Sequence, residues 1–273
     1  MTDLNDATIA MLEAVEREAW CDMYDAAPEE LRAALGFRVE RVRAAAALVL
    51  PAIDMSDFNR VIGLGVEEPA TEAVLDHFLA IYRNRNLKSF LIHVAPNAQP
   101  ANLRDWLATR GLAPTARRWA KMWLQEPPAA GNVTELSVEE ANRDTRMDFG
   151  KAVCAGFGMP DAIAPWSAAL VGRKNWRAFV AKDDGESIGA GALYLNDGAA
   201  WLGVGATRPS HRRRGAHGAI MARRVAEGFS AGARWAVTEG AEDMPGNPNP
   251  SFHNMVRNGF QVAYMRENYG LPR

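Results

Sequence analysis

The sequence predicts a protein of the α/β class, more closely an α+β mixed sheet covered by helices, arranged in two consecutive halves. Two Asp-Gly turns, at 183–185 and 196–198, lie between apolar runs and predict antiparallel hairpins. A strand, a helix and a further strand at 199–239 predict a parallel crossover beside those hairpins. The segment 125–132 contains two prolines and a glycine, which end any element there. We therefore place a domain boundary near 126–132, and 273 residues are enough for two small domains.

The first half is predicted from hydrophobic periodicity and from its stop signals. Ile9, Leu12 and Val15 recur at helical spacing, and Asp6 or Thr8 is a suitable N-cap. Gly111 predicts the end of a later helix, because a left-handed residue is common there. The predicted elements, in chain order, are a helix at 6–24, extended chain at 38–50, a strand at 60–64, a helix at 69–82, a strand at 89–94, a helix at 102–110 and a strand at 119–124.

The second half is predicted to alternate in a similar way. Met221, Val225 and Phe229 are four residues apart, which predicts one apolar face of a helix. The predicted elements are a strand at 133–136, helices beginning at 138 and at 160, strands at 178–181, 187–195 and 199–207, a helix at 215–229, a strand at 233–239, a helix at 250–257 and a strand at 260–266. Both halves contain a strand, a helix, a Gly-apolar pair and a strand, which indicates a duplicated fold.

Composition and charge argue against several classes of protein. Of all residues, 48% are hydrophobic and 23% charged, so the chain is expected to fold rather than stay disordered. The 31 Lys and Arg against 33 Asp and Glu give a formal charge of -2, which argues against a general nucleic-acid binder. No apolar run approaches the roughly 18 residues of a spanning helix, and the acidic N-terminus lacks the pattern of a secretory signal. We expect a cytoplasmic protein with neither a membrane nor a nucleic-acid partner.

Cysteine and histidine spacing predicts no metal site. Cys21 and Cys154 are far apart and belong to no CxxC motif, so two reduced, buried thiols are expected. The five histidines show neither an HExxH motif nor clustered ligand spacing.

The segment 201–221 carries the clearest chemical pattern. A predicted strand ends near Thr207, a loop holds Arg208 and the run 212–214, and Gly215 and Gly218 accompany the start of a helix. Backbone N–H groups at a helix N-terminus and nearby guanidinium groups favour a phosphate or a diphosphate. The segment has no GxxxxGK[ST] motif, and neither Gly203 nor Gly63 begins a complete GxGxxG motif.

This segment resembles the acetyl-CoA loop of the GNAT acetyltransferase family, whose signature is Arg/Gln-x-x-Gly-x-Gly/Ala. Arg212 and Gly215 match the signature, whereas His217 stands where a second small residue is usual. The short helix and Gly-Phe pair at 251–260 resemble another block of the family, and the resemblance covers about 133–270. It implies two tandem acyl-CoA N-acyltransferase (GNAT-like) domains, a degenerate one at 1–128 and a catalytic, acetyl-CoA-binding one at 129–273.

The resemblance also implies a reaction and a site. An acetyl group would pass directly from acetyl-CoA to a primary amine, with no metal and no acyl-enzyme, and the pantetheine arm would lie along the fourth strand of the domain. The residues implied in binding acetyl-CoA are Val204, Gly205, Ala206, Thr207, Arg212, Arg213, Arg214, Gly215, Ala216, His217 and Gly218.

Candidate acid and base residues follow from the same resemblance. A tyrosine four residues before the Gly of the Gly-Phe pair is the family's frequent general acid, and Met255 occupies that place here. Tyr264 is the candidate substitute, with Tyr269 or water as alternatives. Glu239, at the end of the strand beside the cofactor strand, is the candidate base, because an amine must lose a proton before it attacks. His253 is a second candidate for the base, and a solvated or ion-paired carboxylate is the alternative interpretation of Glu239.

Three alternatives stay open. The protein could be a catalytically inactive acyl-CoA sensor or scaffold, it could use a longer acyl-CoA, or the run Arg208–Arg214 could bind nucleic acid. The acceptor is expected to be a small-molecule amine, and both a monomer and a homodimer agree with the sequence.

Overall fold

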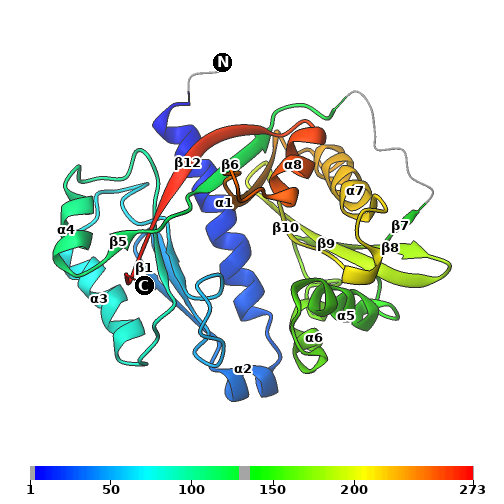
Figure 1. The fold of residues 1–273 in the computed structure, drawn as a ribbon, viewed down its shortest axis with the longest axis horizontal. Coiled ribbons are helices and arrows are strands. Elements are labelled where there is room, and N and C mark those ends of the chain that lie inside the picture. Colours follow the sequence, from blue (N-terminus) through cyan, green and yellow to red (C-terminus); the bar gives the residue numbers. More distant parts are fainter. Residues whose placement is uncertain (1–3, 129–135, 273) are drawn as a thin grey trace. The chain divides into compact units, whose positions relative to one another are not determined.

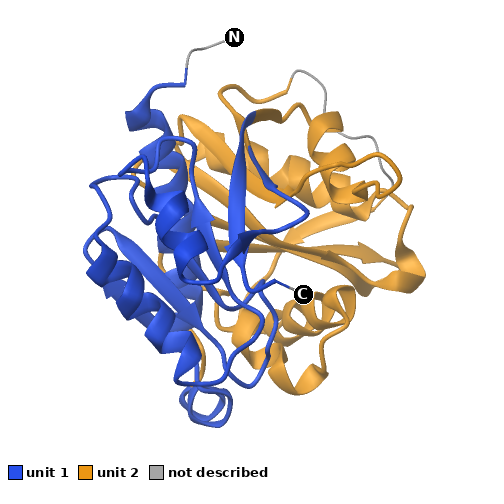
Figure 2. Ribbon diagram, turned by 60° about the vertical axis from the view of Figure 1, so that its left-hand side comes forward, with its two compact units in different colours: residues 1–25, 29–121, 263–273 blue, residues 26–28, 122–262 orange. Residues whose placement is uncertain are grey.

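The computed structural model describes residues 4–128 and 136–272 (Figure 1). The chain divides into two compact units (Figure 2). Unit 1 contains residues 1–25, 29–121 and 263–273, and unit 2 contains residues 26–28 and 122–262. Strands β6 (Trp119–Leu124) and β12 (Gln261–Gly270) each carry the chain from one unit to the other.

Unit 1 is a mixed sheet with helices on both faces. Its strands follow the order β1-β2-β3-β4-β12, in which β3 and β4 are parallel and the other neighbours antiparallel. The short β5 pairs with β12. The further elements of unit 1 are α1 (Asp6–Asp25), α2 (Glu29–Leu35), β1 (Arg38–Val42), β2 (Ala45–Val49), β3 (Arg60–Ile62), α3 (Glu72–Arg83), β4 (Leu91–Val94), α4 (Leu103–Thr109) and β5 (Ala113–Pro114).

The core of unit 1 follows from alternation along its strands. Val61 and Ile92 lie in one cluster with Phe78 of α3 and Leu107 of α4. The intervening residues, such as Arg60, point to the opposite face, because successive side chains of a strand alternate. That face receives α1, whose Glu16 lies 3.9 Å from Arg60.

Unit 2 contains a mixed sheet in the order β11-β10-β9-β8-β7. Strands β7 to β10 pair antiparallel, whereas β10 and β11 pair in parallel. Its elements are β7 (Ser137–Glu140), α5 (Arg146–Phe157), the 3-10 turn η1 (Asp161–Ile163), α6 (Ala164–Ala168), β8 (Trp176–Asp183), β9 (Glu186–Asn196), β10 (Ala199–Thr207), η2 (Pro209–His211), α7 (Ala216–Ser230), β11 (Trp235–Ala241) and α8 (Pro250–Arg257).

Helices α5 and α7 cover opposite faces of this sheet (Figure 1). A Cβ on Gly156 of α5 would lie 2.5 Å from the Cβ of Ala206, and a Cβ on Gly205 would lie 3.4 Å from Arg224 of α7. Neighbouring strand residues therefore contact different helices, as the pleat of a strand requires. Both predicted hairpin turns are confirmed, since Asp184-Gly185 and Asp197-Gly198 all have positive φ.

Several predicted elements differ from the structure. Residues 38–50 form a hairpin of β1 and β2, because Arg43 adopts φ 56° between them. Residues 138–140 belong to β7 rather than to a helix, and α5 begins only at Arg146. Helix α2 was not predicted, and its seven residues include none that is buried. Residues 133–135 of the strand predicted at 133–136 lie outside the described residues.

The compact units also differ from the expected division at 128. The long segment of unit 1 ends at Lys121, within β6. Residues from Ala263 onward belong to unit 1 again. The reason is backbone pairing, because Glu267, Asn268 and Tyr269 of β12 pair with β4 of unit 1.

Cys21 and Cys154 are free and buried, as expected. Across the described residues, every helix is too short or too polar to span a bilayer.

Candidate functional site

The N-terminus of α7 has no side-chain cap. Its N-cap residue is Gly215, which adopts φ 88° and provides no side chain to accept a hydrogen bond. The carbonyl of Gly215 accepts from Ala219, which opens the helical ladder. The N–H groups of Ala216, His217 and Gly218 precede that first bond and have no partner within the helix. They present partial positive charge to whatever lies before the helix, so this end can bind an anion.

Arginines surround this helix end. Arg212 donates to the carbonyls of Thr207 (3.5 Å) and Gly156 (3.1 Å) and so ties the loop to α5. Arg208 pairs with Glu186 at 2.8 Å, and Arg214 pairs with Asp183. Residues 212–215 are exposed, and Arg213 has φ 65°. Exposed ion pairs contribute little energy, so an incoming anion could recruit these guanidinium groups.

Strand β10 parts from β11 before it reaches this loop. Their pairing ends at Trp201 and Val237, six residues short of the end of β10. The residues before this point are buried, whereas Gly203, Val204 and Gly205 keep part of their surface exposed. The buried hydroxyl of Thr207 has no hydrogen-bond partner among the described residues. Beyond Leu202, β10 therefore has an edge that β11 does not pair, as expected for a strand that accepts an extended ligand.

His217 lies beside that edge. Its Nε2 is 3.4 Å from the place where a Cβ of Gly205 would stand, and its Nδ1 is 3.4 Å from the Asn254 amide. Burial and the nearby charge of Arg224 lower the pKa of His217 to about 4. The imidazole is therefore neutral at pH 7, so at this position only the backbone N–H can attract an anion.

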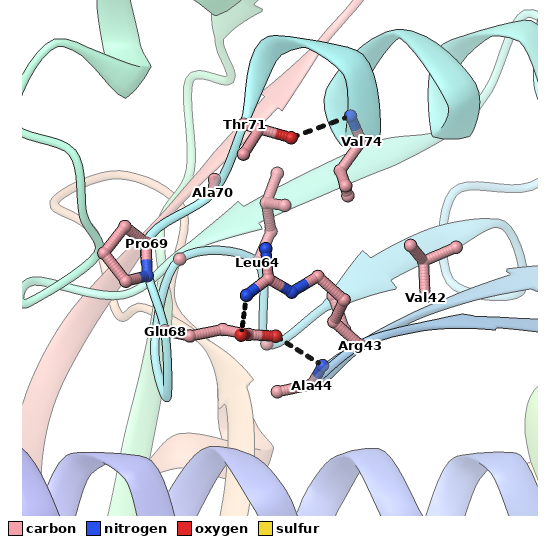
Figure 3. A pocket seen from close by; sticks show the side chains of 12 residues that line it. Val42, Arg43, Ala44, Leu64, Glu68, Pro69, Ala70, Thr71 and Val74 are labelled. Atoms are coloured by element: carbon pink, nitrogen blue, oxygen red, sulfur yellow. Dashed lines mark hydrogen bonds and ion pairs between the residues drawn. The ribbon is translucent and has the colours of Figure 1, made fainter.

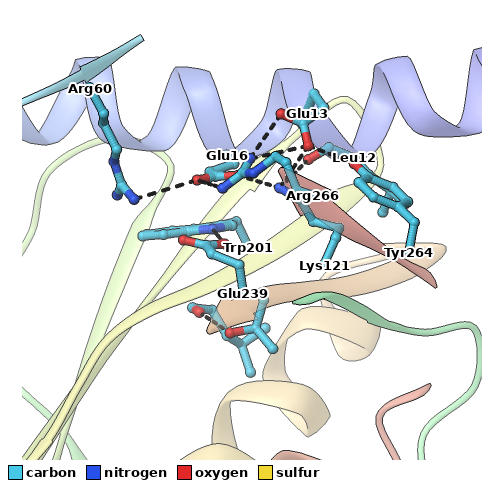
Figure 4. Close-up of polar contacts among 11 residues, drawn as sticks. Leu12, Glu13, Glu16, Arg60, Lys121, Trp201, Glu239, Tyr264 and Arg266 are labelled. Atoms are coloured by element: carbon cyan, nitrogen blue, oxygen red, sulfur yellow. Dashed lines mark hydrogen bonds and ion pairs between the residues drawn. The ribbon is translucent and has the colours of Figure 1, made fainter. Parts of the chain in front are cut away.

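Glu239 lies on β11 just past the point where the two strands part (Figure 4). It is half-buried, and its Oε2 accepts a hydrogen bond from the indole Nε1 of Trp201 at 2.8 Å. Thr238 donates its hydroxyl to the carbonyl of Leu202 at 2.8 Å, which holds the two strands together at the fork. Met255 is buried with its Cε near Gly240, so the usual place of the family's tyrosine holds an apolar side chain.

His253, the second candidate for the base, and three further side chains of unit 2 have other surroundings. His253 pairs with Asp243 at 3.1 Å, and His211 contacts Ser210 at 2.9 Å. Trp176 is buried and packs its ring edge-on to Trp201, with centroids 6.2 Å apart. Phe157, at the end of α5, is 56% exposed.

Tyr264 belongs to a buried ionic cluster of unit 1 (Figure 4). Its hydroxyl donates to Glu13 at 2.6 Å, and burial, followed by the charge of Glu13, raises its pKa. Arg266 donates to both Glu13 (2.9 Å) and Glu16 (2.5 Å), and Lys121 donates to Glu16. These contacts give Tyr264 a structural role, which its sequence position did not suggest.

Unit 1 contains a segment that corresponds to β10, its loop and α7. Strand β3 leads through a loop into α3 and then into the parallel β4. Here Thr71 caps the helix by accepting from the N–H of Val74 at 3.3 Å (Figure 3). Glu68 accepts from the N–H of Ala44 and pairs with Arg43, and the adjoining cavity measures about 10 Å³. That space holds no more than about one water molecule. The hydroxyl of Thr71 therefore caps α3, whereas α7 has no such cap, and the carboxylate of Glu68 is already paired with Arg43 and the N–H of Ala44.

Sequence reasoning missed two residues that shape the site of unit 2. Trp201 holds the carboxylate of Glu239, and Arg224 lies buried under β10, where its Nη1 donates to Gly203 at 2.8 Å. Arg224 follows Ile220 by four residues, so it occupies the buried face of α7. An arginine at an apolar position was the available signal. Among the described residues, no three His, Cys, Asp or Glu side chains form a group suited to a metal ion.

Comparison with known proteins identifies the fold. The sequence matches no protein-family model and no curated protein. A GCN5-related N-acetyltransferase from Kribbella flavida is similar, with a TM-score of 0.61 and 16% identity over 93% of this chain and 95% of that one. One from Sphaerobacter thermophilus has a TM-score of 0.58 and 17% identity over 97% of this chain and 92% of that chain. A tandem GNAT protein from the clavulanic acid biosynthesis pathway has a TM-score of 0.58 and 15% identity over 97% of this chain and 94% of that chain.

These similarities extend over nearly the full length of each chain. The structure therefore has the mixed α/β fold of the GNAT acyl-CoA N-acyltransferases, in its tandem form. The fold class expected from the sequence is confirmed.

Proposed function

We propose that unit 2 binds acetyl-CoA and transfers its acetyl group directly to the primary amine of a small molecule. One observation carries the proposal: β10 parts from β11 after Trp201 and leads into an uncapped helix flanked by exposed arginines. This arrangement offers an unpaired strand edge and an anion site in direct succession. Pantetheine carries amide groups that suit a strand edge, and the diphosphate of coenzyme A suits the helix end.

The described residues fit this ligand at both ends. The N–H groups of 216–218 and the side chains of Arg212, Arg213 and Arg214 would hold the diphosphate. The edge of β10 from Val204 to Thr207 would accept the pantetheine arm, and the unpartnered hydroxyl of Thr207 would gain a partner there. When bound, acetyl-CoA supplies the activated thioester. The GNAT fold, which the structure shares, supports the same assignment.

Glu239 is the proposed general base. A primary amine has a pKa near 10 and is almost entirely protonated at pH 7, so it needs a proton acceptor before attack. The indole of Trp201 fixes one carboxylate oxygen of Glu239 at the fork of β10 and β11. The carboxylate would accept the amine's proton directly or through a water molecule.

We assign the protonation of the leaving thiolate to water. Met255 has no proton to give, and the hydroxyl of Tyr264 already donates to Glu13. A thiol ionises near pH 8.5, so a thiolate leaves without a strong acid. Tyr264 as the general acid stays a prediction. The free, buried thiols of Cys21 and Cys154 agree with a reducing compartment such as the cytoplasm.

Unit 1 is proposed as the degenerate copy. Its loop places Glu68 where unit 2 has Arg212–Arg214, and Thr71 already caps its helix. We therefore expect one acyl-CoA site for each chain.

Calorimetric titration with acetyl-CoA tests the site. Arg212→Ala removes a charged donor and should raise the Kd roughly tenfold or more. Gly215→Glu adds a negative charge and a side chain at a φ of 88°, and should abolish measurable binding. Arg143→Ala, an exposed arginine of the same unit, is the matched control and should leave the Kd unchanged. If the wild-type protein binds no acetyl-CoA, or if Gly215→Glu binds it normally, the site is assigned wrongly.

A panel of primary amines, with released thiol as the readout, tests the transfer itself. Thiol release that depends on an amine supports the enzyme. Tight binding without release across the panel would instead support a sensor or scaffold.

A further inference from the structure

Strand β10 contains a bulge beside the proposed thioester position. Gly203 pairs with Ala192 of β9, and the next pair joins Ala206 to Ala190. Val204 and Gly205 thus both face the single residue Gly191, so β10 carries one extra residue here. Val204 adopts φ 54°, which is uncommon for a β-branched side chain and needs support from its surroundings.

Arg224 of α7 contacts the backbone next to this bulge. Its Nη1 donates to the carbonyl of Ala192 at 3.0 Å and to that of Gly203 at 2.8 Å, the two partners of the last regular pair. Its Nε donates to Ile220 within its own helix at 3.3 Å. The guanidinium thus connects β9, β10 and α7 at the residue where the regular ladder stops.

The neighbouring glycines provide the room for this side chain. A Cβ on Gly191 would lie 2.6 Å from the Cγ2 of Ile220 and 2.9 Å from the Cζ of Arg224, closer than such atoms approach each other. A Cβ on Gly205 would lie 3.4 Å from its Nη2. A larger residue at 191 would crowd the side chains of both Ile220 and Arg224.

Arg224 is a buried cation that no carboxylate among the described residues neutralises. It is 2% exposed, and burial lowers its pKa to about 9, so it stays charged at pH 7. A buried charge without a counter-ion is unfavourable, and an apolar side chain would pack here without that cost. What the guanidinium adds is its set of bonds to the carbonyls at the bulge.

The bulge also sets which face each following residue occupies. Ala206 points at α5, where the missing side chain of Gly156 leaves room for its Cβ, while Gly205 points at α7. If the extra residue were absorbed into the ladder, this alternation would reverse and every later side chain would change face. The loop at 208–215 would then start from a different position.

We propose that Arg224 is the positioning residue that keeps the bulge of β10 in place and so aims the backbone of Val204 and Gly205 at the acyl thioester. The inference rests on the proposed function, because the orientation of this backbone affects the reaction only if the thioester binds along β10. The diphosphate site at 212–218 lies beyond the bulge and uses different groups. Arg224 therefore serves the acyl end of the ligand more than its phosphate end.

The experiment compares Arg224→Met with Arg223→Met in the full chain. Arg223 is the neighbouring residue on α7, but its side chain is 48% exposed and pairs with Glu227. For Arg224→Met we expect at least a tenfold loss of kcat with acetyl-CoA, with the Kd for free CoA within about threefold of wild type. Faster hydrogen exchange of the amides of residues 203–206 should accompany the loss. Arg224→Lys should recover part of kcat, and Arg223→Met should match wild type in all three measurements.

A second variant protects the test against misfolding. Gly191→Ala leaves Arg224 in the chain but crowds its guanidinium together with the side chain of Ile220, so it should reproduce the loss of kcat and the faster exchange. Normal kcat and normal exchange in either Arg224→Met or Gly191→Ala would overturn the inference. Failure of the wild-type protein to bind CoA would refute the proposed function instead, and exchange at 203–206 would still decide whether Arg224 holds the bulge.

Discussion

The indole of Trp201 and the carboxylate of Glu239 meet at the point where β10 and β11 separate. Trp201 belongs to the last regular pair of the two strands, with Val237, and Glu239 lies two residues further along β11 on the same face. The 2.8 Å hydrogen bond between them crosses the fork. A carboxylate in this place is fixed in orientation while it stays half-exposed to an incoming amine.

Replacing Glu239 should remove most of the activity and leave the binding of acetyl-CoA intact. Glu239→Gln keeps the shape and the acceptor for Trp201 but cannot take a proton at pH 7. A general base contributes about 10²- to 10⁴-fold, so kcat should fall by that order. Trp201→Phe should lower kcat less, because the base remains but is no longer held. Steady-state kinetics and calorimetry measure both effects, and wild-type kcat in Glu239→Gln would exclude this residue as the base.

Removal of Arg266 should destabilise the protein strongly. Arg266 is 1% exposed and contacts Glu13 and Glu16, so Arg266→Met leaves two buried carboxylates with too few partners. Breaking a buried pair on one side costs about 3–5 kcal/mol. Arg104→Met is the control, since Arg104 pairs with Glu267 of the same strand but both side chains are more than a third exposed. Urea unfolding should show that the control lowers the free energy of unfolding by at most about 1 kcal/mol. Equal losses for the two variants would contradict the role of the cluster.

Stability should fall as the pH is lowered from 6.5 to 5, because of buried neutral histidines. Burial lowers the pKa of His217 to about 4, and burial, with the charges of Arg266 and Arg60, holds the pKa of His93 well below its usual range. The unfolded chain binds these protons near pH 6.5, so acid favours unfolding through this window. Carboxylates with lowered pKa, such as Glu16, lose their stabilisation only below about pH 4.5.

The test follows the urea midpoint against pH. His217→Asn should show a smaller decline between pH 6.5 and 5 than wild type. The exposed His77→Asn is the control and should decline like wild type. A decline that His217→Asn leaves unchanged would mean that the imidazole is protonated in the folded state.

Each chain should bind one molecule of acetyl-CoA. In unit 1, Thr71 caps α3 and Glu68 is paired with Arg43 and Ala44, so Glu68→Gln should leave the stoichiometry near one and the Kd unchanged. Calorimetry on wild type, Glu68→Gln and Gly215→Glu gives the comparison. A second equivalent site in wild type, or loss of binding in Glu68→Gln, would contradict the assignment of unit 1 as degenerate.

Local patterns predicted much of this structure. The Asp-Gly pairs at 184–185 and 197–198 require positive φ and form the turns that were predicted. The glycine and arginine pattern at 208–218 predicted a helix end suited to an anion, and α7 begins there without a side-chain cap. The prediction of a helix at 138 was wrong, because residues 137–140 pair with β8 and tertiary pairing overrode the local pattern.

The sequence by itself determined most of the element order, the turn chemistry and the charged loop, because these depend on neighbours within a few residues. Only the tertiary structure decided that the C-terminal strand belongs to unit 1, that Tyr264 serves Glu13, that Trp201 holds Glu239 and that Arg224 lies at a bulge. Each of these features depends on strand pairing or on packing between residues far apart in the chain. The role of a buried charged side chain can be assigned only when its hydrogen-bond partners are known.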